Sequence, residues 1–178
     1  KVFVSDENRS RILRYPNASA LANGAGAEAV LGQTSFSAST PAATAAGISS
    51  PQCMFLDRLG RLWLTDSIFN RVLMFEAAAY RASSTNADRV YGQSDFTTTT
   101  SATTAAKMSY PLGVWVDSND RLWVADFSNN RVLRFDSITT KASGASANGV
   151  LGQVDFTSST GGSGSSKFNG PEGISVTA

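Results

Sequence analysis

The stretch RLWLTDSIFNRVLMF, Arg61–Phe75, decides the fold because it returns sixty residues later as RLWVADFSNNRVLRF, Arg121–Phe135. A third version, KVFVSDENRSRILRY, opens the chain at Lys1–Tyr15. A second marker keeps the same spacing, as LGQTSF from Leu31, YGQSDF from Tyr91 and LGQVDF from Leu151. The chain therefore consists of three copies of one unit, and a fixed period of this length predicts a repeat architecture.

Each unit has the pattern of four short strands separated by turn-forming residues. In the third copy we expect these strands at Leu112–Asp117, Arg121–Ala125, Arg131–Asp136 and Gly149–Phe156. Val, Leu, Trp and Phe dominate them, and Asp, Asn and Ser fill the gaps. The apolar runs are continuous rather than alternating, which indicates burial on both faces of the sheet. Four-stranded sheets covered on both faces by neighbouring copies are the blades of a β-propeller.

The expected fold class is therefore all-β, a β-propeller with three four-stranded blades per chain, or half of a six-bladed ring. We expect one repeat domain over residues 1–178. The first unit, residues 1–50, supplies strands two to four of a split blade and a connection. Residues 51–110 and 111–170 form complete blades, called here the second and third units. Residues 171–178 are the innermost strand of the split blade.

The third unit carries the features of a known repeat. Pro111–Phe135 contains a Pro followed two positions on by Gly, a strand ending in Asp, then Arg-Leu-Trp-Val-x-Asp and Asn-Asn-Arg-Val-Leu-x-Phe. This segment resembles an NHL repeat, and the ending Val150–Phe156 is similar to long-repeat bacterial members of that family. The resemblance extends over all three copies and implies a six-bladed propeller. Cys53 departs from the pattern, because the other copies have Gly113 and Gly173 at its position.

Three blades are too few for a ring, since propellers have about four to eight. The leading hypothesis is a homodimer, in which the C-terminal strand of each chain completes the N-terminal blade of the other. A ring closed in this way has six blades. Two alternatives use the same strands: the rest of a longer chain closes the ring, or the ends pair without closing and build a filament.

Composition restricts the chemistry. Fifteen basic and fourteen acidic residues give a net charge of +1, which favours neither a nucleic-acid nor a membrane partner. The single Cys53 cannot form an internal disulfide, and without His no imidazole can bind a metal or transfer a proton. We expect no cofactor. Ser- and Thr-rich connections and few Lys residues favour an extracellular or cell-surface location, although these residues contain no signal peptide.

Two sets of residues are candidates for a role. The repeated carboxylates and guanidinium groups are predicted to be structural, holding the copies together rather than performing acid-base chemistry; they are Asp6, Asp66, Asp126, Arg11, Arg71 and Arg131. The loops between strands two and three differ among the copies and lie on one face of a propeller. Their predicted contacts with a protein or glycan ligand are Phe69, Phe127, Asn129 and Arg9.

The sequence favours a non-catalytic extracellular scaffold or binding module. The first alternative is the structural subunit of an extracellular filament. The second follows from the resemblance, because six-bladed relatives include lactonases: a calcium-dependent hydrolase that uses Asp, Glu and Asn. Asp117–Asp120 has a weak likeness to a calcium loop but is interpreted as a hairpin turn, and Trp63 and Trp123 are interpreted as core residues.

Overall fold

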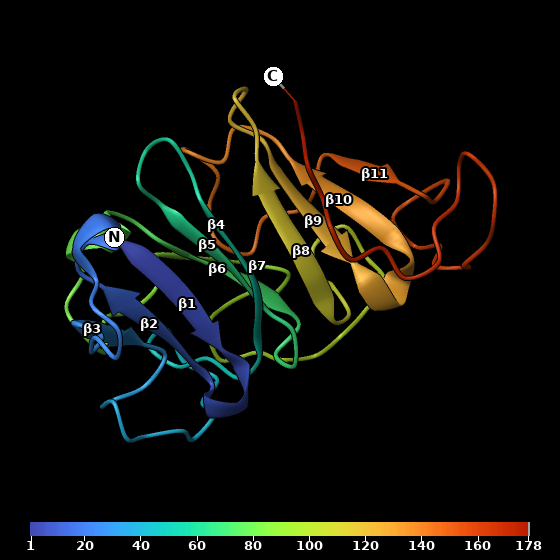
Figure 1. Cartoon of the computed structure of the whole chain (residues 1–178). Helices are drawn as coiled ribbons and strands as arrows, with labels where there is room; N and C mark the ends of the chain where they lie inside the picture. The colour runs from blue at the N-terminus through green and yellow to red at the C-terminus, as the bar shows by residue number, and fades with distance from the viewer. Residues whose placement is uncertain (178) are drawn as a thin grey trace.

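The computed structural model describes residues 1–177 and contains three antiparallel sheets, one for each unit (Figure 1). The first sheet has three strands: β1 (Val2–Asp6), β2 (Arg11–Tyr15) and β3 (Ala29–Leu31). The second has four: β4 (Pro51–Leu56), β5 (Leu62–Asp66), β6 (Arg71–Phe75) and β7 (Arg89–Tyr91). The third also has four: β8 (Pro111–Val116), β9 (Leu122–Asp126), β10 (Arg131–Phe135) and β11 (Gly149–Leu151).

The turns β1–β2, β5–β6 and β9–β10 occupy equivalent positions in the three units and end in the same way. Each ends on a residue with positive φ: Ser10 (51°), Asn70 (54°) and Asn130 (50°). Asn occupies this left-handed conformation more readily than most residues, which explains its presence in two of the three copies. The turn sets the register, so that Asp6 pairs with Arg11, Asp66 with Arg71 and Asp126 with Arg131.

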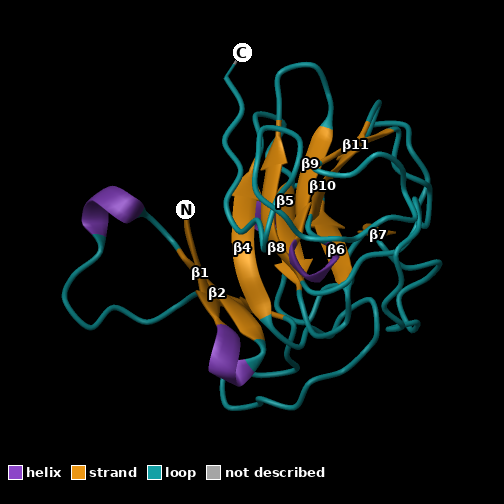
Figure 2. Cartoon of the chain, turned by 90° about the vertical axis from the view of Figure 1, so that its right-hand side faces the viewer, coloured by secondary structure: helices purple, strands orange, loops and turns teal. Residues whose placement is uncertain are grey.

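The sheets stack face to face with two apolar cores between them. One core joins the first and second sheets through residues such as Ile12, Leu64 and Leu73. The other joins the second and third sheets and contains Trp63 and Phe135. Strands β4 and β8 lie side by side at the inner edge of their sheets (Figure 2). Three blades stacked in this way form a partial β-propeller.

The predicted strand boundaries hold for most of the third unit, but the fourth strand is wrong in length. It ends at Leu151 rather than at Phe156. Gly152 adopts a φ of 85° and turns the backbone away from the sheet. The Gln153 side-chain amide then donates to the carbonyl oxygens of Asn130 and Thr160. Gln153 therefore bonds two loops instead of extending the strand ladder.

The segment after the third sheet does not form the predicted strand within the described residues. It forms no ladder with β8 or with any other strand of the described residues. It nevertheless runs beside β8 (Figure 1). The Glu172 carbonyl oxygen would lie 2.2 Å from a Cβ at Gly113, so only glycine permits this approach. Ala178 of the predicted strand lies outside the described residues.

The long connections lie over neighbouring sheets. Gly144 donates its backbone N–H to the carbonyl oxygen of Val90, and the Ser143 hydroxyl accepts from the N–H of Val90. Ser84 and Ser83 make the same two contacts with Val30 of the first sheet. Each connection therefore binds the outer strand of the preceding blade. No helix among residues 1–177 is long and apolar enough to cross a membrane.

Candidate functional site

The repeated Asp–Arg pair is the polar centre of each complete blade. In the second unit, Arg71 Nε donates to Asp66 Oδ2 at 2.9 Å, and both side chains are fully buried. The same guanidinium donates to the carbonyl oxygens of Phe96 and Gly47. The Gly47 carbonyl belongs to the connection from the preceding unit. One side chain therefore joins a strand, its own outer loop and the neighbouring blade.

Asp66 completes this centre by accepting backbone hydrogen bonds from the same connection. Its Oδ1 accepts from the N–H groups of Ser49 and Ser50 at 2.9 and 3.1 Å. Burial raises the pKa of Asp66, against the opposing effects of the Arg71 charge and these N–H groups. With every polar atom of the pair engaged, the structural interpretation of these residues accounts for all of their contacts.

The third unit repeats the arrangement. Arg131 Nε donates to Asp126 Oδ2 at 2.7 Å, again with both side chains fully buried. Arg131 also donates to the carbonyl oxygens of Thr104 and Lys107, and the N–H of Ser109 donates to Asp126 Oδ1. Burial likewise raises the pKa of Asp126.

The first unit has the same pair but an incomplete centre. Arg11 Nε lies 2.8 Å from Asp6 Oδ2, and Arg11 also bonds the carbonyl of Phe36. However, the two side chains are 13% and 30% exposed. Within residues 1–177 no connection from a preceding unit supplies carbonyls to Arg11 or N–H groups to Asp6. We call this half-filled centre, Asp6 with Arg11, the open centre.

The apolar faces at the two ends of the stack are also incomplete. Val4 of β1 is 43% exposed, whereas Leu64 and Val124, at the equivalent positions of the other sheets, are fully buried. At the opposite end, Leu151 is 50% exposed, although its equivalent Tyr91 is fully buried against Phe135. The first and third sheets therefore each leave one face exposed, and we call these two surfaces the open faces; the equivalent faces elsewhere are covered at the internal interfaces.

A second polar motif joins the turn between strands one and two to the Trp of strand two. Asp57 Oδ2 accepts from Arg61 Nε at 2.6 Å and from Trp63 Nε1 at 2.9 Å. Asp117 does the same with Arg121 at 2.7 Å and Trp123 at 2.8 Å. The prediction from sequence missed this motif. The recurring pattern Asp-x-x-x-Arg-Leu-Trp, residues 57–63 and 117–123, could have revealed it.

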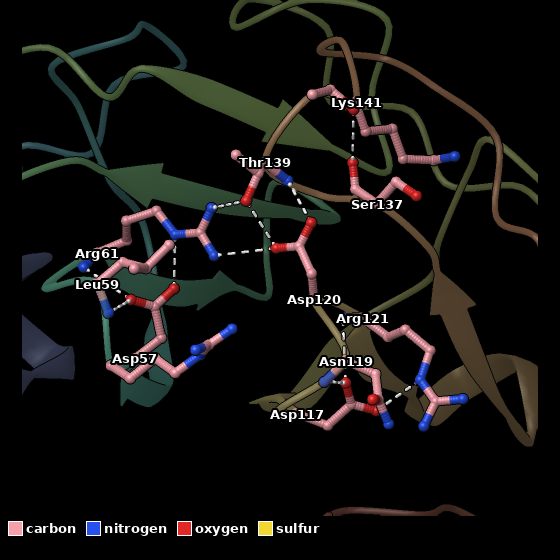
Figure 3. Close-up of polar contacts among 12 residues, drawn as sticks. Asp57, Leu59, Arg61, Asp117, Asn119, Asp120, Arg121, Ser137, Thr139 and Lys141 are labelled. Carbon is pink, nitrogen blue, oxygen red and sulfur yellow. Dashed lines mark hydrogen bonds and ion pairs between the residues drawn. The ribbon is translucent and has the colours of Figure 1, made fainter.

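These motifs meet between the second and third units (Figure 3). Arg61 Nη1 donates to Thr139 Oγ1 at 3.0 Å, and Arg61 Nη2 lies 3.4 Å from Asp120 Oδ1. Thr139 in turn donates to Asp120 at 2.7 Å. The carboxylates of the suggested calcium loop are thus engaged by Arg, Trp, Thr and backbone N–H groups, as the hairpin interpretation predicts. A hollow of about 160 Å³ lies beside them, lined by apolar atoms of Phe55, Leu59 and Val116.

The predicted ligand residues lie in equivalent turns of the three units but are less accessible than expected. Arg9 is exposed. Phe69 is half-buried, with the Arg71 guanidinium 5.2 Å from its ring centre. Phe127 is also half-buried and packs edge-on against Tyr110, with 6.2 Å between ring centres.

Asn129 corrects the expectation of an exposed amide. Its side chain is 4% exposed, and its amide nitrogen donates to Asp126 Oδ2 at 2.8 Å and to the Ala102 carbonyl. Its amide oxygen accepts from the Thr103 hydroxyl. Asn129 therefore extends the Asp126–Arg131 centre instead of facing a ligand. Two of these three bonds could not be expected from sequence, because they join Asn129 to a connection 26 and 27 residues away.

Among residues 1–177, no group of three or more Cys, Asp or Glu side chains could hold a metal ion. The NHL repeat matches the chain at residues 108–135, which cover β8, β9 and β10. Comparison with curated proteins found no match. The three stacked sheets, one for each unit, and the matched repeat define a repeat protein of the partial β-propeller class. Its matched segment, residues 108–135, carries the NHL repeat.

Proposed function

We propose that the chain is a non-catalytic, protein-binding scaffold whose first binding partner is a second copy of itself. Two copies associate head to tail: the open face of the third unit covers the first unit of the other copy, and each C-terminal segment completes the other copy's three-stranded blade. The rotation between successive blades then closes a six-bladed ring.

One observation carries this proposal. The open centre and the two open faces are the equivalents, in the end units, of the surfaces that bind each other at the internal interfaces. Asp66–Arg71 and Asp126–Arg131 are buried because a preceding unit covers them, while Asp6–Arg11 lacks that cover. At the second internal interface, the second unit covers the Asp–Arg centre of the third. Because the units repeat, the third unit of one copy can cover the Asp–Arg centre of the first unit of another copy in the same way. An exposed strand edge at β1 favours the same association.

The non-catalytic part of the proposal rests on how the carboxylates are used. Asp57, Asp66, Asp117 and Asp126 each bind an Arg side chain and at least one backbone N–H group. Such pairing fixes the units and leaves these groups engaged rather than poised for proton transfer. The extracellular location stays a prediction from composition, as does a protein or glycan ligand at the turns that hold Arg9, Phe69 and Phe127.

The test is the mass of the 178-residue chain in solution, measured by light scattering on a size-exclusion column. A ring predicts twice the mass of one chain at all concentrations well above the dissociation constant. Deletion of residues 172–178 should give a monomer, and Ser118→Ala, on an exposed turn, is the control. Folded wild-type monomers would refute self-association. A concentration-dependent ladder of larger species would replace the closed ring with a filament, and an unfolded chain would show that further blades of a longer protein are needed.

A further inference from the structure

The innermost strand of a blade pairs in one fixed register. In the second sheet, Pro51 lies opposite Asp66, and Met54 lies opposite Leu64. In the third sheet, Pro111 lies opposite Asp126, and Val114 opposite Val124. Both ladders contain an irregularity after the Pro, where the register shifts. The two complete blades thus share one pairing scheme although their innermost strands differ in sequence.

The first sheet lacks this strand, and the C-terminal segment has its sequence without its ladder. Its strand order is β1-β2-β3, so no strand of residues 1–177 pairs with the edge of β1 that corresponds to the paired edges of β5 and β9. Pro171, Ile174 and Val176 stand where the innermost strands have Pro111, Val114 and Val116. The contact of Glu172 with Gly113 holds the segment next to β8, as β8 lies next to β4.

We propose that residues 171–176 of a second copy pair with β1 in the register of the complete blades. This inference rests on the proposed association of two copies and specifies its geometry. The second copy's Pro171 lies opposite Asp6, its Ile174 opposite Val4, and its Val176 opposite Val2. The irregularity falls at Glu172 and Gly173 of that copy. Val4 and Ile174 then share one face of the completed sheet.

The open centre favours the same register, because its missing partners are backbone groups that directly precede the innermost strand. In the third unit, Asp126 Oδ1 accepts from the N–H of Ser109, two residues before Pro111. The equivalent donor for Asp6 is the N–H of the second copy's Asn169. Arg131 Nη2 donates to the carbonyls of Thr104 and Lys107. The equivalent acceptors for Arg11 are the carbonyls at positions 164 and 167 of the second copy.

The opposite end of the chain contributes a matching contact. Arg14 Nη1 donates across the first internal interface to the carbonyl oxygens of Ala78 and Arg81, at 2.9 and 2.6 Å. Arg134 is the equivalent of Arg14 in the third unit and lies on its uncovered face. Its equivalent acceptors are the carbonyls of positions 18 and 21 in the second copy.

Those acceptors lie on a turn that ends in the same way as its equivalent in the second unit. Ala18–Ala20 forms a single 3-10 turn followed by extended backbone, as does Ala78–Tyr80. At the internal interface Arg14 is oriented by Glu28, whose carboxylate lies 2.7 Å from its Nε. Arg134 instead pairs with Asp136 at 2.8 Å, two residues away on the chain.

Disulfide trapping tests the register. In a Cys53→Ala background, Val4→Cys is combined with Ile174→Cys, because directly opposite residues of antiparallel strands have Cα atoms about 4.5 to 5.5 Å apart, within disulfide range. The control combines Val4→Cys with Ser175→Cys, which a one-residue slip would bring opposite each other. Mild oxidation should convert more than about half of the first variant, and little of the control, into a covalent species of two chains. Scattering on the reduced proteins checks that both variants still associate.

Each outcome separates the register from the association. Equal trapping in both variants, or trapping in the control alone, overturns the register while the association stands. A reduced dimer that traps in neither variant means that the copies meet through another surface, which also overturns the register. Covalent ladders support the register but refute the closed ring. Reduced variants that remain monomeric at the concentration where wild type is a dimer, with no trapping, overturn the proposed pairing at this edge; wild-type monomers refute the proposed function itself.

Discussion

The internal interfaces and the open centre are built from the same residues, yet they differ in what surrounds those residues. Asp66–Arg71 and Asp126–Arg131 are fully buried, while Asp6–Arg11 is partly exposed. The pairs have similar distances of 2.9, 2.7 and 2.8 Å. The ion pair itself therefore forms within one unit, and its burial depends on the neighbouring connection.

This difference shows where the cooperativity of the chain resides. In a repeat protein, stability is approximately the sum of the stabilities of the units and the energies of the interfaces between them. Each internal interface here combines an apolar core with a guanidinium that bonds across the junction. The same side chains at the open centre contribute less until another unit covers them.

The largest expected effect is the loss of a buried guanidinium. Arg71→Ala should lower the free energy of unfolding by about 3–5 kcal/mol, because it leaves the buried Asp66 carboxyl without its partner. Arg11→Ala should cost about 1 kcal/mol or less within one chain, because Asp6 remains partly solvated. Urea unfolding followed by circular dichroism at a concentration where the chain is monomeric compares the two.

In the light-scattering measurement of association, Arg11→Ala should have a larger effect than Arg71→Ala. Arg11→Ala should raise the dimer dissociation constant, while the fraction of Arg71→Ala that stays folded still presents an intact open centre. Equal losses of stability in the two variants would show that Asp6–Arg11 is complete within a single chain.

The Asp–Arg–Trp motif provides the next test. Asp117→Asn should lower the free energy of unfolding by about 1–3 kcal/mol, because an amide NH₂ group cannot accept hydrogen bonds. In either orientation it would face two donors, either Arg121 Nε and Trp123 Nε1 or the backbone N–H groups of Asn119 and Arg121. Ser118→Ala, one residue further along the exposed turn, should change it by less than about 0.5 kcal/mol. The first unit lacks this motif, since Lys1 and Phe3 stand in the places of Arg121 and Trp123. If Asp117→Asn left the free energy of unfolding unchanged, the motif would not explain any difference in stability between the complete blades and the split blade.

Much of this organisation follows from sequence because it is local or periodic. The strands Arg121–Ala125 and Arg131–Asp136 were expected within a residue of their observed ends, since turn chemistry and apolar runs lie within a few positions. The partners of Asn129 and the end of β11 were missed. Two partners of Asn129 lie in a connection that returns to the turn from 26 and 27 residues away, where no periodic signal identifies the contact. The end of β11 has a signal that was not used, because the Gly-Gln pair repeats at 32–33, 92–93 and 152–153.

The acid dependence of stability should report the same motif. Burial opposes ionisation of Asp117, but hydrogen bonds from Trp123, Arg121 and two backbone N–H groups outweigh it and lower its pKa. A carboxyl with a lowered folded-state pKa stabilises the fold above its unfolded-state pKa of about 3.9, and this contribution disappears as the pH falls below that value. The stability difference between wild type and Asp117→Asn should therefore shrink between about pH 5 and pH 3. A constant difference over this range, measured by urea unfolding at each pH, would contradict the lowered pKa of Asp117 in the fold.

The last prediction concerns the hydroxyl of Thr65, which is present in the second unit and absent at the equivalent position of the third. Thr65 Oγ1 donates to the Leu112 carbonyl of β8 at 2.9 Å and accepts from the Cys53 N–H, and the residue is fully buried. Thr65→Ala should cost about 1 kcal/mol, because it leaves the Cys53 N–H and the Leu112 carbonyl without that partner. Ala125 occupies the equivalent position in the third unit, and there Gly113 replaces Cys53. Ser5→Ala, the matched change on β1, should be nearly neutral in the monomer because Ser5 is only half-buried. A loss of stability at Ser5 that appears only when the protein associates would show that the split blade closes with the hydroxyl contact of the second unit rather than with the close glycine packing of the third.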